Sequence, residues 1–489
     1  MPIFYSALLL TGVNLLLRFV STSFQVFISG KLGAAGVGLL QLVLSVGTLA
    51  TTAAMAGART ATMYLTAEEL GRKRDGNLVW VLSGCFLYSI LCSGAVCFLL
   101  YWLAPVVAEN WVGVADTAGP IRLLAAFLPV SCLCGVMTGY FTAANRIGTL
   151  AVVEVAEQLC SMVAIISLLS FWAGSDPIRA CEAVILGSSM GACITLVVLV
   201  ILRIRAAPVS GMRIPVSRRL LHVAVPLALA DDLRSGISTT ENLMVPKRLA
   251  LYPAIASPLS AFGMVCGMVF PVLMFPAAII YGLAELLIPE LARCAAAGSQ
   301  TRIRYLSRKS LRITALYGFF FSGGMFLLSE WLCNALYGNR EAGHWLRWYA
   351  LLIPMLYCDA ITDAMIKGLG QQTASVRYNI LTSALDVAFL YLLLPKFGMS
   401  GYYASFLVTH VLNFFLSLRR LLKTTKNRLS LTVPLRIFVA AALSVLLGIS
   451  LNGIWSAVAY TLSFSSLLTF FRVIGKTDLQ WISGLIQKK

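Results

Sequence analysis

Long runs of apolar residues recur along the whole chain, separated by short polar segments. A run of about 18 or more apolar residues with few charges is typical of a transmembrane helix, because about 20 residues cross the hydrocarbon layer. The alternation expected of a transmembrane β-strand is not visible. Of the 489 residues, 59% are apolar and only 12% are charged, which leaves too little polar surface for a water-soluble globule. The sequence therefore predicts an all-α, polytopic membrane protein.

Fourteen spans are expected from these runs. They lie at residues 3–29, 36–65, 78–104, 118–143, 149–172, 180–202, 220–248, 259–290, 311–337, 345–367, 375–394, 400–421, 434–451 and 453–471.

Basic residues are concentrated in every second connection. Loops 66–77, 203–219, 291–310 and 422–433 are rich in Lys and Arg, whereas loop 105–117 is acidic or near neutral. Short basic loops stay in the cytoplasm, so we expect a multi-pass protein of the cell membrane with both termini cytoplasmic. This topology accounts for the net charge of +18 without a nucleic-acid partner, and membrane lipids are the expected neighbours.

The basic loop 203–219 is the expected linker between two six-helix halves. They are an N-lobe of helices 1–6 at 1–202 and a C-lobe of helices 7–12 at 220–421, and residues 422–489 add helices 13 and 14 and a cytoplasmic tail. No connection is long enough for an extramembrane catalytic domain, so an enzyme is not expected. The cysteines form no CxxC pair or zinc-spaced cluster, so we expect neither a metal nor a cofactor.

Polar residues recur at helical spacing inside several predicted spans. In the first span Asn14, Arg18 and Gln25 fall on one face, with Arg18 near its middle. A guanidinium at that depth suits a phosphate, a pyrophosphate or a buried carboxylate. The second span carries Arg59 toward its cytoplasmic end.

The seventh span is the most polar. Asp231, Ser235, Ser238 and Asn242 form one stripe, Arg234 and Glu241 extend it, and Asp232 lies beside it. Asp359, Asp363 and Lys367 follow one another at steps of four in the tenth span. A charge in mid-membrane costs at least about 2.5 kcal/mol, so these residues need partners or a hydrated cavity. Pairing between helices as structural glue is one interpretation, and a hydrated cavity shared by Arg18 and the span 7 stripe is the other.

Five segments carry a further signal. They are ISGKLGAAGVGLLQLVLSVGTLATTAAMAG (28–57), PVSCLCGVMTGYFTAANRIG (129–148) followed by Glu157 and Gln158, ENLMVPKRL (241–249), FPVLMFPAAIIYGLAELLIPELA (270–292) and KGLGQQTASVRYNILTSALDVAFLYLLLPKFGMSGYYAS (367–405). These segments resemble the oligosaccharide-flippase branch of the MOP exporter superfamily, and within it the stage V sporulation protein B-like subgroup of polysaccharide biosynthesis proteins. Two departures are Arg59, where the subgroup usually has proline, and Ser161, where it usually has arginine.

The resemblance implies two six-helix lobes in a MATE-like V shape, with alternating access and a polyprenyl-pyrophosphate-linked saccharide as substrate, such as a peptidoglycan or polysaccharide precursor. The expected substrate-binding residues are Arg18, Arg59 and Arg234 for the pyrophosphate and Asn14, Gln25 and Asn242 for polar groups of the substrate. Asp231, Asp232, Glu241, Asp359 and Asp363 are the expected groups for proton or sodium coupling.

Two other functions stay open at this point. One is a cation-coupled multidrug exporter of the same superfamily, against which the two additional C-terminal spans argue. The other is a non-transporting scaffold of a cell-wall or spore-cortex synthesis complex, with cell-wall synthesis proteins as candidate partners.

Overall fold

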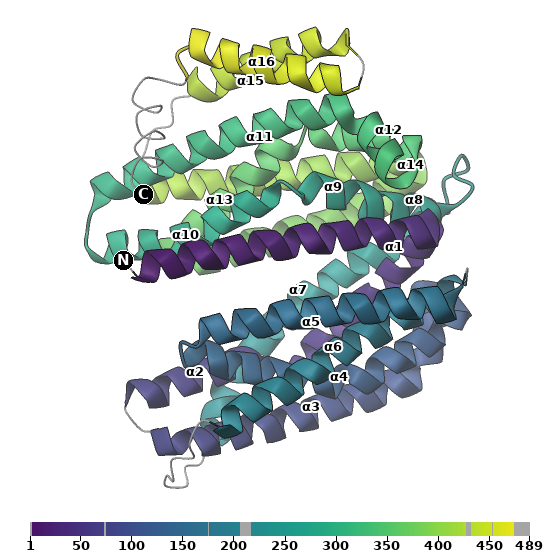
Figure 1. The fold of residues 1–489 in the computed structure, drawn as a ribbon, viewed down its shortest axis with the longest axis vertical. Helices are drawn as coiled ribbons and strands as arrows, with labels where there is room; N and C mark the ends of the chain where they lie inside the picture. The colour runs from purple at the N-terminus through teal and green to yellow at the C-terminus, as the bar shows by residue number, and fades with distance from the viewer. Residues whose placement is uncertain are drawn as a thin grey trace. The chain divides into compact units, whose positions relative to one another are not determined.

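The computed structural model describes residues 2–72, 75–174, 176–205, 217–426, 432–451 and 453–473, and the side chains of residues 2–18 lie outside this description. Every regular element in these ranges is a helix (Figure 1). The α-helices are α1 Pro2–Met55, α2 Ala58–Gly71, α3 Leu78–Val106, α4 Ala118–Ala143, α5 Ile147–Leu168, α6 Pro177–Arg205, α7 Ser217–Leu249, α8 Pro258–Met264, α9 Phe270–Met274, α10 Ala277–Ala296, α11 Gln300–Tyr337, α12 Arg340–Ala350, α13 Ile353–Gly368, α14 Gln372–Thr425, α15 Thr432–Ile449 and α16 Ile454–Phe470. Short 3-10 turns occupy Asp75–Asn77 and Ala115–Thr117, and π-helical turns occupy Val107–Val112, Leu169–Ala173 and Val265–Val269.

The helices agree with the predicted all-α membrane fold. In the described ranges, eight helices are long and apolar enough to cross a membrane, or ten if each of two bent pairs counts as one span. Two of the long helices are interrupted by non-helical glycines, α1 at Gly33 and α14 at Gly398. The helix α14 covers two expected spans, whereas α1 covers the first and most of the second, which α2 completes. The charged α7 and the 17-residue α16 cover the remaining two. Each of the fourteen expected spans therefore lies on helix.

Proline breaks the eighth and tenth expected spans. The segment from α8 to α9 bends by 63° against α10 at Pro276, and α12 bends by 55° against α13 next to Pro354. A bend inside a membrane frees backbone carbonyls that water cannot reach. At the first break, Tyr357 donates its hydroxyl to the carbonyl of Leu273 at 3.2 Å, and Tyr317 donates to that of Pro276 at 2.8 Å. The Tyr357 hydroxyl therefore satisfies a carbonyl that the bend releases, whereas the Pro276 carbonyl also accepts from the backbone N–H of Ile279 at 3.3 Å.

The chain forms two compact units. The first contains Met1–Val13 and Phe27–Gly263, and its core lies between α2, α3 and α4, where Leu65, Cys85, Met137 and Phe141 are almost fully buried. Lipid is as apolar as these side chains, so such a core gains stability from close packing more than from removal of water.

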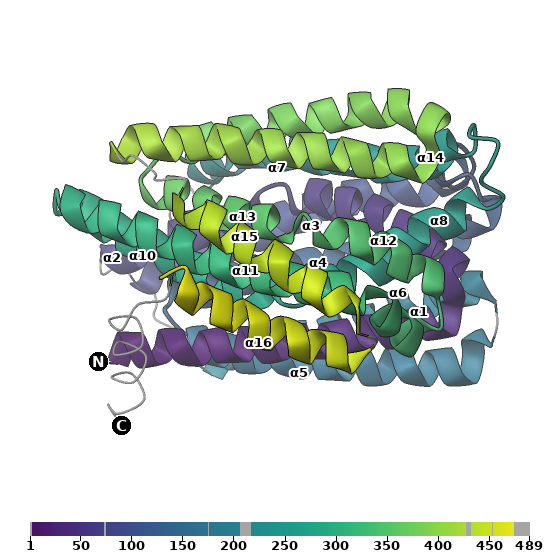
Figure 2. The ribbon, with the colours of Figure 1, turned by 90° about the horizontal axis from the view of Figure 1, so that it is seen from above.

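The second unit contains Asn14–Val26 and Met264–Lys489. In it α13 packs against α10, α11 and α14, and the α15–α16 pair packs on α11 (Figures 1 and 2). Tyr460 of α16 anchors this pair, because its hydroxyl donates to the carbonyl of Phe319 at 2.8 Å and its ring stacks on Phe464.

The bounds of these units differ from the expected lobes at 1–202 and 220–421, because α7 packs on α2 and α3 and is counted with the first unit. The expected lobes are the two halves of a structural repeat, and the halves of a repeat need not coincide with packing units. The expected division therefore stays a prediction.

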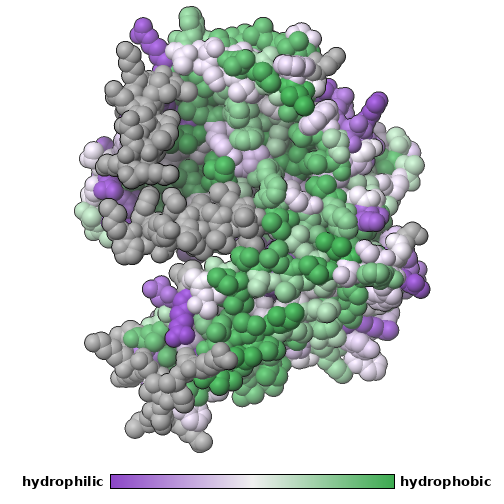
Figure 3. Space-filling model, in the orientation of Figure 1, coloured by the Kyte–Doolittle hydropathy of each residue, from purple (hydrophilic) through white to green (hydrophobic). Residues whose placement is uncertain are grey.

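The described helices expose many large apolar side chains, among them Trp102, Phe171, Leu446 and Trp455. On the face drawn in Figure 3 hydrophobic residues extend along the helices, and strongly hydrophilic residues lie near the helix ends. This distribution is the one that a hydrocarbon layer requires.

Candidate functional site

A cavity of about 810 Å³ lies within the first unit, between the second half of α1, the start of α2 and α7. Twelve of its seventeen lining residues are threonine, serine, arginine, aspartate or asparagine. The lining residues are Leu44, Ser45, Gly47, Thr48, Thr51, Thr52, Met55, Gly57, Arg59, Thr60, Leu124, Asp231, Arg234, Ser235, Ser238, Thr239 and Asn242.

The α7 side of the cavity is the stripe that helical spacing predicts. Asp231, Ser235, Ser238 and Asn242 all line the cavity, and Arg234 lines it with them. Spacings of four, three and four residues place side chains on one face of a helix, which is why the sequence alone indicated this face.

The α1 side is a row of hydroxyl groups that sequence reasoning missed. Ser45, Thr48 and Thr52 each donate to the carbonyl four residues earlier, at 2.7, 2.9 and 2.8 Å. Uncharged hydroxyls in an apolar run satisfy themselves in this way in many membrane helices, so they did not stand out. Their recurrence at steps of three and four was the available signal.

Hydrogen bonds join these two faces. Asn242 donates its amide to the Ser45 hydroxyl at 3.0 Å, and Thr239 donates to the Ser45 carbonyl at 3.1 Å. Thr52 lies 3.4 Å from the Ser235 hydroxyl. The two helices are therefore tied together along the polar faces that line the cavity.

A break in the second expected span places Arg59 at this cavity. Ala56 and Gly57 have left-handed backbone conformations, with φ of 44° and 71°, and α2 starts directly after them. A Cβ on Gly57 would lie 2.5 Å from the carbonyl oxygen of Ala224 in α7, so only glycine fits there. Arg59 follows in the first turn of α2, exposed to the cavity.

The lining carries a net positive charge, because it contains Arg59 and Arg234 but only one acid, Asp231. All three side chains are exposed, and among the described residues no ion pair joins Asp231 to either arginine. Guanidinium donors that are not already committed to a carboxylate are available to an anion.

Three of the expected substrate-binding residues are not placed in the cavity. The side chains of Asn14 and Arg18 lie outside the described residues, so their roles stay predictions. Gln25 belongs to the second unit and is absent from the lining, and its amide nitrogen is buried without a hydrogen-bond partner among the described residues.

The acidic residues expected to couple transport to an ion lie in different parts of the structure. Asp231 lines the cavity, whereas Asp232 and Glu241 lie partly buried on α7 outside the lining. In the second unit, Asp359 accepts a hydrogen bond from Asn413 at 2.9 Å while its other oxygen is buried without a described partner. Asp363 is already engaged, by Lys367 at 2.6 Å and by the hydroxyl of Ser375.

Asp386 is a further, partly buried acid outside the expected set. It accepts a hydrogen bond from Ser405, and Thr409 lies 3.3 Å from the same oxygen. Across the described ranges, no three His, Cys, Asp or Glu side chains are grouped to hold a metal ion.

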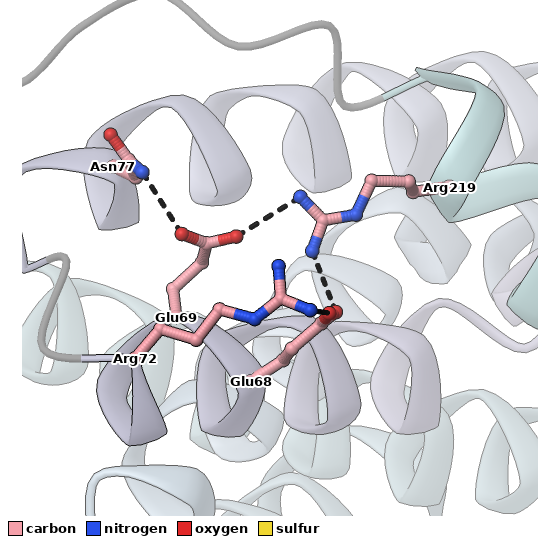
Figure 4. Close-up of polar contacts among 5 residues, drawn as sticks. All are labelled: Glu68, Glu69, Arg72, Asn77 and Arg219. Atoms are coloured by element: carbon pink, nitrogen blue, oxygen red, sulfur yellow. Dashed lines mark hydrogen bonds and ion pairs between the residues drawn. The ribbon is translucent and has the colours of Figure 1, made fainter.

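A cluster of charged residues fixes the start of α7 (Figure 4). Arg219 contacts Glu69 at 3.0 Å and Glu68 at 2.6 Å, Arg72 contacts Glu68 at 2.8 Å, and Asn77 donates to Glu69 at 2.9 Å. The Glu69 side chain is fully buried. The hydrogen bond to Glu68 raises the pKa of Arg219 above its ordinary value, so the guanidinium stays charged. We call these residues the Arg219 cluster.

Solved structures share this fold. The lipid II flippase MurJ in an inward closed conformation matches with a TM-score of 0.71 at 12% identity, over 96% of this chain and 99% of that one. An inward-facing multidrug resistance transporter of the MATE family matches with a TM-score of 0.68 at 13% identity, over 86% of this chain and 100% of that one. The fold is thus that of the transporters of the MOP superfamily.

The family follows from the sequence comparison. The family described as "Polysaccharide biosynthesis protein" matches residues 4–250, just over half of the chain, and the chain belongs to this family. Stage V sporulation protein B of Bacillus subtilis (strain 168) is 22% identical over 412 residues, 81% of this chain and 78% of that protein. Sporulation protein YkvU of the same organism is 21% identical over 305 residues, 59% of this chain and 67% of that protein. The resemblance predicted from the motifs is confirmed.

Proposed function

We propose that this protein flips a polyprenyl-pyrophosphate-linked saccharide across the cytoplasmic membrane by alternating access. The observation that carries the proposal is the cavity of about 810 Å³, with two arginines that, among the described residues, form no ion pair with the single aspartate of the lining and with hydroxyl and amide groups around them. Flipping moves a pyrophosphate and a sugar through hydrocarbon while the lipid tail remains in it. A hydrated cavity with cationic anchors lowers the cost of that passage.

In this proposal Arg59 and Arg234 bind the pyrophosphate, because a guanidinium presents paired donors that match phosphate oxygens. Arg18 is the predicted third cation. The hydroxyl row of α1 and Asn242 supply donors and acceptors that suit a saccharide.

In this proposal the acidic side chains of the predicted spans couple transport to an ion. Asp359 is the strongest candidate, since one of its oxygens has no described donor and is available to a proton or a sodium ion. The membrane potential is the alternative driving force for transport, at about 2.3 kcal/mol per charge per 100 mV.

The charge of the cavity separates this function from export of cationic drugs. Two arginines against one aspartate attract an anion and repel a cation. Similarity to lipid II flippase MurJ supports the proposal at the level of fold, and the MATE transporter shows that the same fold also serves multidrug export.

The test is a flipping assay in proteoliposomes with a labelled polyprenyl-pyrophosphate-linked saccharide, with a cationic dye as a parallel substrate. We expect flipping by the wild type and a loss of about tenfold or more in Arg59→Gln and Arg234→Gln. Arg179→Gln is the matched control, since Arg179 is 59% exposed and its one ion pair among the described residues is with Asp176 at 3.7 Å. Transport of the dye without flipping would assign the protein to the exporters, and transport of neither would favour the scaffold.

A further inference from the structure

A second, smaller cavity of about 190 Å³ lies in the second unit, where α13 ends and α14 begins. The chain turns at Gly370, whose φ is 73°, and Arg420 reaches the turn from the far end of α14. The lining consists of Gly370, Gln371, Thr373, Ala374, Arg377, Tyr378 and Arg420. It shares no residue with the larger cavity.

The charge of this cavity is wholly positive. Arg377 and Arg420 line it, and no carboxylate is among its lining residues. The acid nearest in sequence, Asp363, is held by Lys367 at 2.6 Å and by Ser375. That acid is therefore committed to fixing the turn and not to neutralising the two arginines.

Not every N–H group of the Arg420 guanidinium has a hydrogen-bond acceptor among the described residues. One terminal nitrogen donates to the side-chain oxygen of Gln371, whereas its Nε is buried and has no hydrogen-bond partner in the described part of the chain. A buried donor without an acceptor costs about 1–3 kcal/mol, and a rotation of this guanidinium toward an anion in the cavity would remove that cost. This orphaned donor is a second observation, independent of the charge, that points to a ligand.

The surrounding groups fit a phosphate. Thr373 and Tyr378 bring hydroxyl groups to the lining. The helix α14 begins at Gln372, and the start of a helix carries a partial positive charge and free backbone N–H groups. Two guanidinium groups, two hydroxyls and a helix start together form a set of donors with little acceptor capacity.

We infer that this cavity binds a phosphate-bearing anion at the membrane surface predicted to be cytoplasmic, separately from the transported substrate. The phosphate is that of an anionic phospholipid headgroup or a free inorganic phosphate, and both present the same oxygens. Arginine pockets between helices at the cytoplasmic surface suit lipid headgroups in general. The inference does not depend on the proposed transport function.

The experiment measures binding and not transport. The full-length protein in detergent is titrated with phosphatidylglycerol and, in a separate arm, with phosphatidylethanolamine, and native mass spectrometry counts the bound lipid. A third arm titrates inorganic phosphate against chloride at constant ionic strength and follows the thermal unfolding midpoint. We expect Arg420→Gln and Arg377→Gln each to weaken binding of phosphatidylglycerol or phosphate by about tenfold.

Arg419→Gln is the matched control, because Arg419 is the exposed neighbour of Arg420 on α14 and does not line the cavity. It removes the same charge and should leave binding within about twofold. Arg377 is exposed, so its variant should fold even where Arg420→Gln does not. A loss confined to phosphatidylglycerol identifies a headgroup site, and an equal loss with inorganic phosphate identifies a free-phosphate site. Equal affinities of Arg377→Gln, Arg419→Gln and the wild type for both probes would overturn the inference.

Discussion

Asn242 donates its side-chain amide to the hydroxyl of Ser45 at 3.0 Å, and this bond joins the predicted polar stripe of α7 to the hydroxyl row of α1. The two residues are 197 positions apart in the sequence. They belong to the two helix faces between which the larger cavity lies, so the bond fixes the spacing of its walls.

Replacing Asn242 or Ser45 by alanine should therefore weaken the attachment of α7 to α1. Hydrogen bonds between membrane helices contribute about 0.6 kcal/mol on average, so we expect a coupling energy near that size in the double-mutant cycle. Unfolding in mixed detergent micelles measures it. Thr240→Ala is the control, because Thr240 is exposed and its hydroxyl, within the described part of the chain, donates to the carbonyl of Gly236 on its own helix. Strict additivity of the two single variants would show that the bond contributes nothing.

Gly57→Ala should destabilise the protein by about 2 kcal/mol or more. Alanine in the left-handed conformation costs about 1–2 kcal/mol, and its Cβ would meet the Ala224 carbonyl at 2.5 Å. Thermal unfolding of the purified protein provides the measurement. Gly94→Ala is the matched change, because a Cβ at Gly94 meets nothing within 4 Å and the residue lies inside helix α3. It should be neutral or stabilising by up to about 1 kcal/mol, and a similar loss in both variants would refute the clash.

Arg219→Ala should cost about 2–3 kcal/mol of stability, because it leaves the buried Glu69 carboxylate without its cation. The value lies at the low end for a broken buried pair, since the Arg219 side chain is 33% exposed. Adding Glu69→Gln to Arg219→Ala should recover part of the loss. Arg72→Ala removes an exposed cation from the same cluster and should change stability by less than about 1 kcal/mol. Equal losses in Arg72→Ala and Arg219→Ala would contradict the burial argument.

The same pair should be insensitive to moderately alkaline pH. The pKa of Arg219 is raised above its ordinary value, so its contribution to stability is complete below that ordinary value and is lost only as the pH rises through the still higher folded-state pKa. The coupling energy between Arg219 and Glu69 should thus be constant from pH 7 to about pH 11. In Arg219→Lys the contribution should fade once the pH passes the lysine pKa, ordinarily about 10.4. A wild-type coupling that declines by pH 10 would rule out the arginine as its source.

Tyr357→Phe should destabilise the protein by about 1–2 kcal/mol, because it leaves the Leu273 carbonyl at the break of the eighth span without a donor. Tyr317→Phe should cost less, because the Pro276 carbonyl keeps the backbone N–H of Ile279 as a donor at 3.3 Å. Tyr64→Phe is the control, since Tyr64 is 56% exposed. Unfolding in mixed micelles compares the three, and identical midpoints would show that another donor replaces the phenols.

The sequence alone predicted the positions of the spans and the residues on the α7 side of the larger cavity. The spans follow from apolar length, and the stripe from Asp231 to Asn242 follows from helical spacing, because both are local properties of the chain. The ion pair between Lys367 and Asp363 could also be predicted, since the two residues are four positions apart on one helix.

The rest depends on contacts between distant segments. The face of α1 from Ser45 to Thr52 lines the cavity because α7 packs beside it, and no local sequence pattern predicts that α7 is its neighbour. Glu69 pairs with Arg219 across 150 residues, where many other basic residues were equally available by sequence. The cavity at Arg420 combines a turn with a side chain 49 residues away from Gln371.

The tyrosines at the broken eighth span have a consequence for the rigidity of the bend. Tyr357 of α13 and Tyr317 of α11 bind the carbonyls of Leu273 and Pro276, so two neighbouring helices of the second unit hold the break from different sides. A helix that straightened at this point would have to give up both bonds. The bend is therefore a fixed part of the packing and not a free hinge.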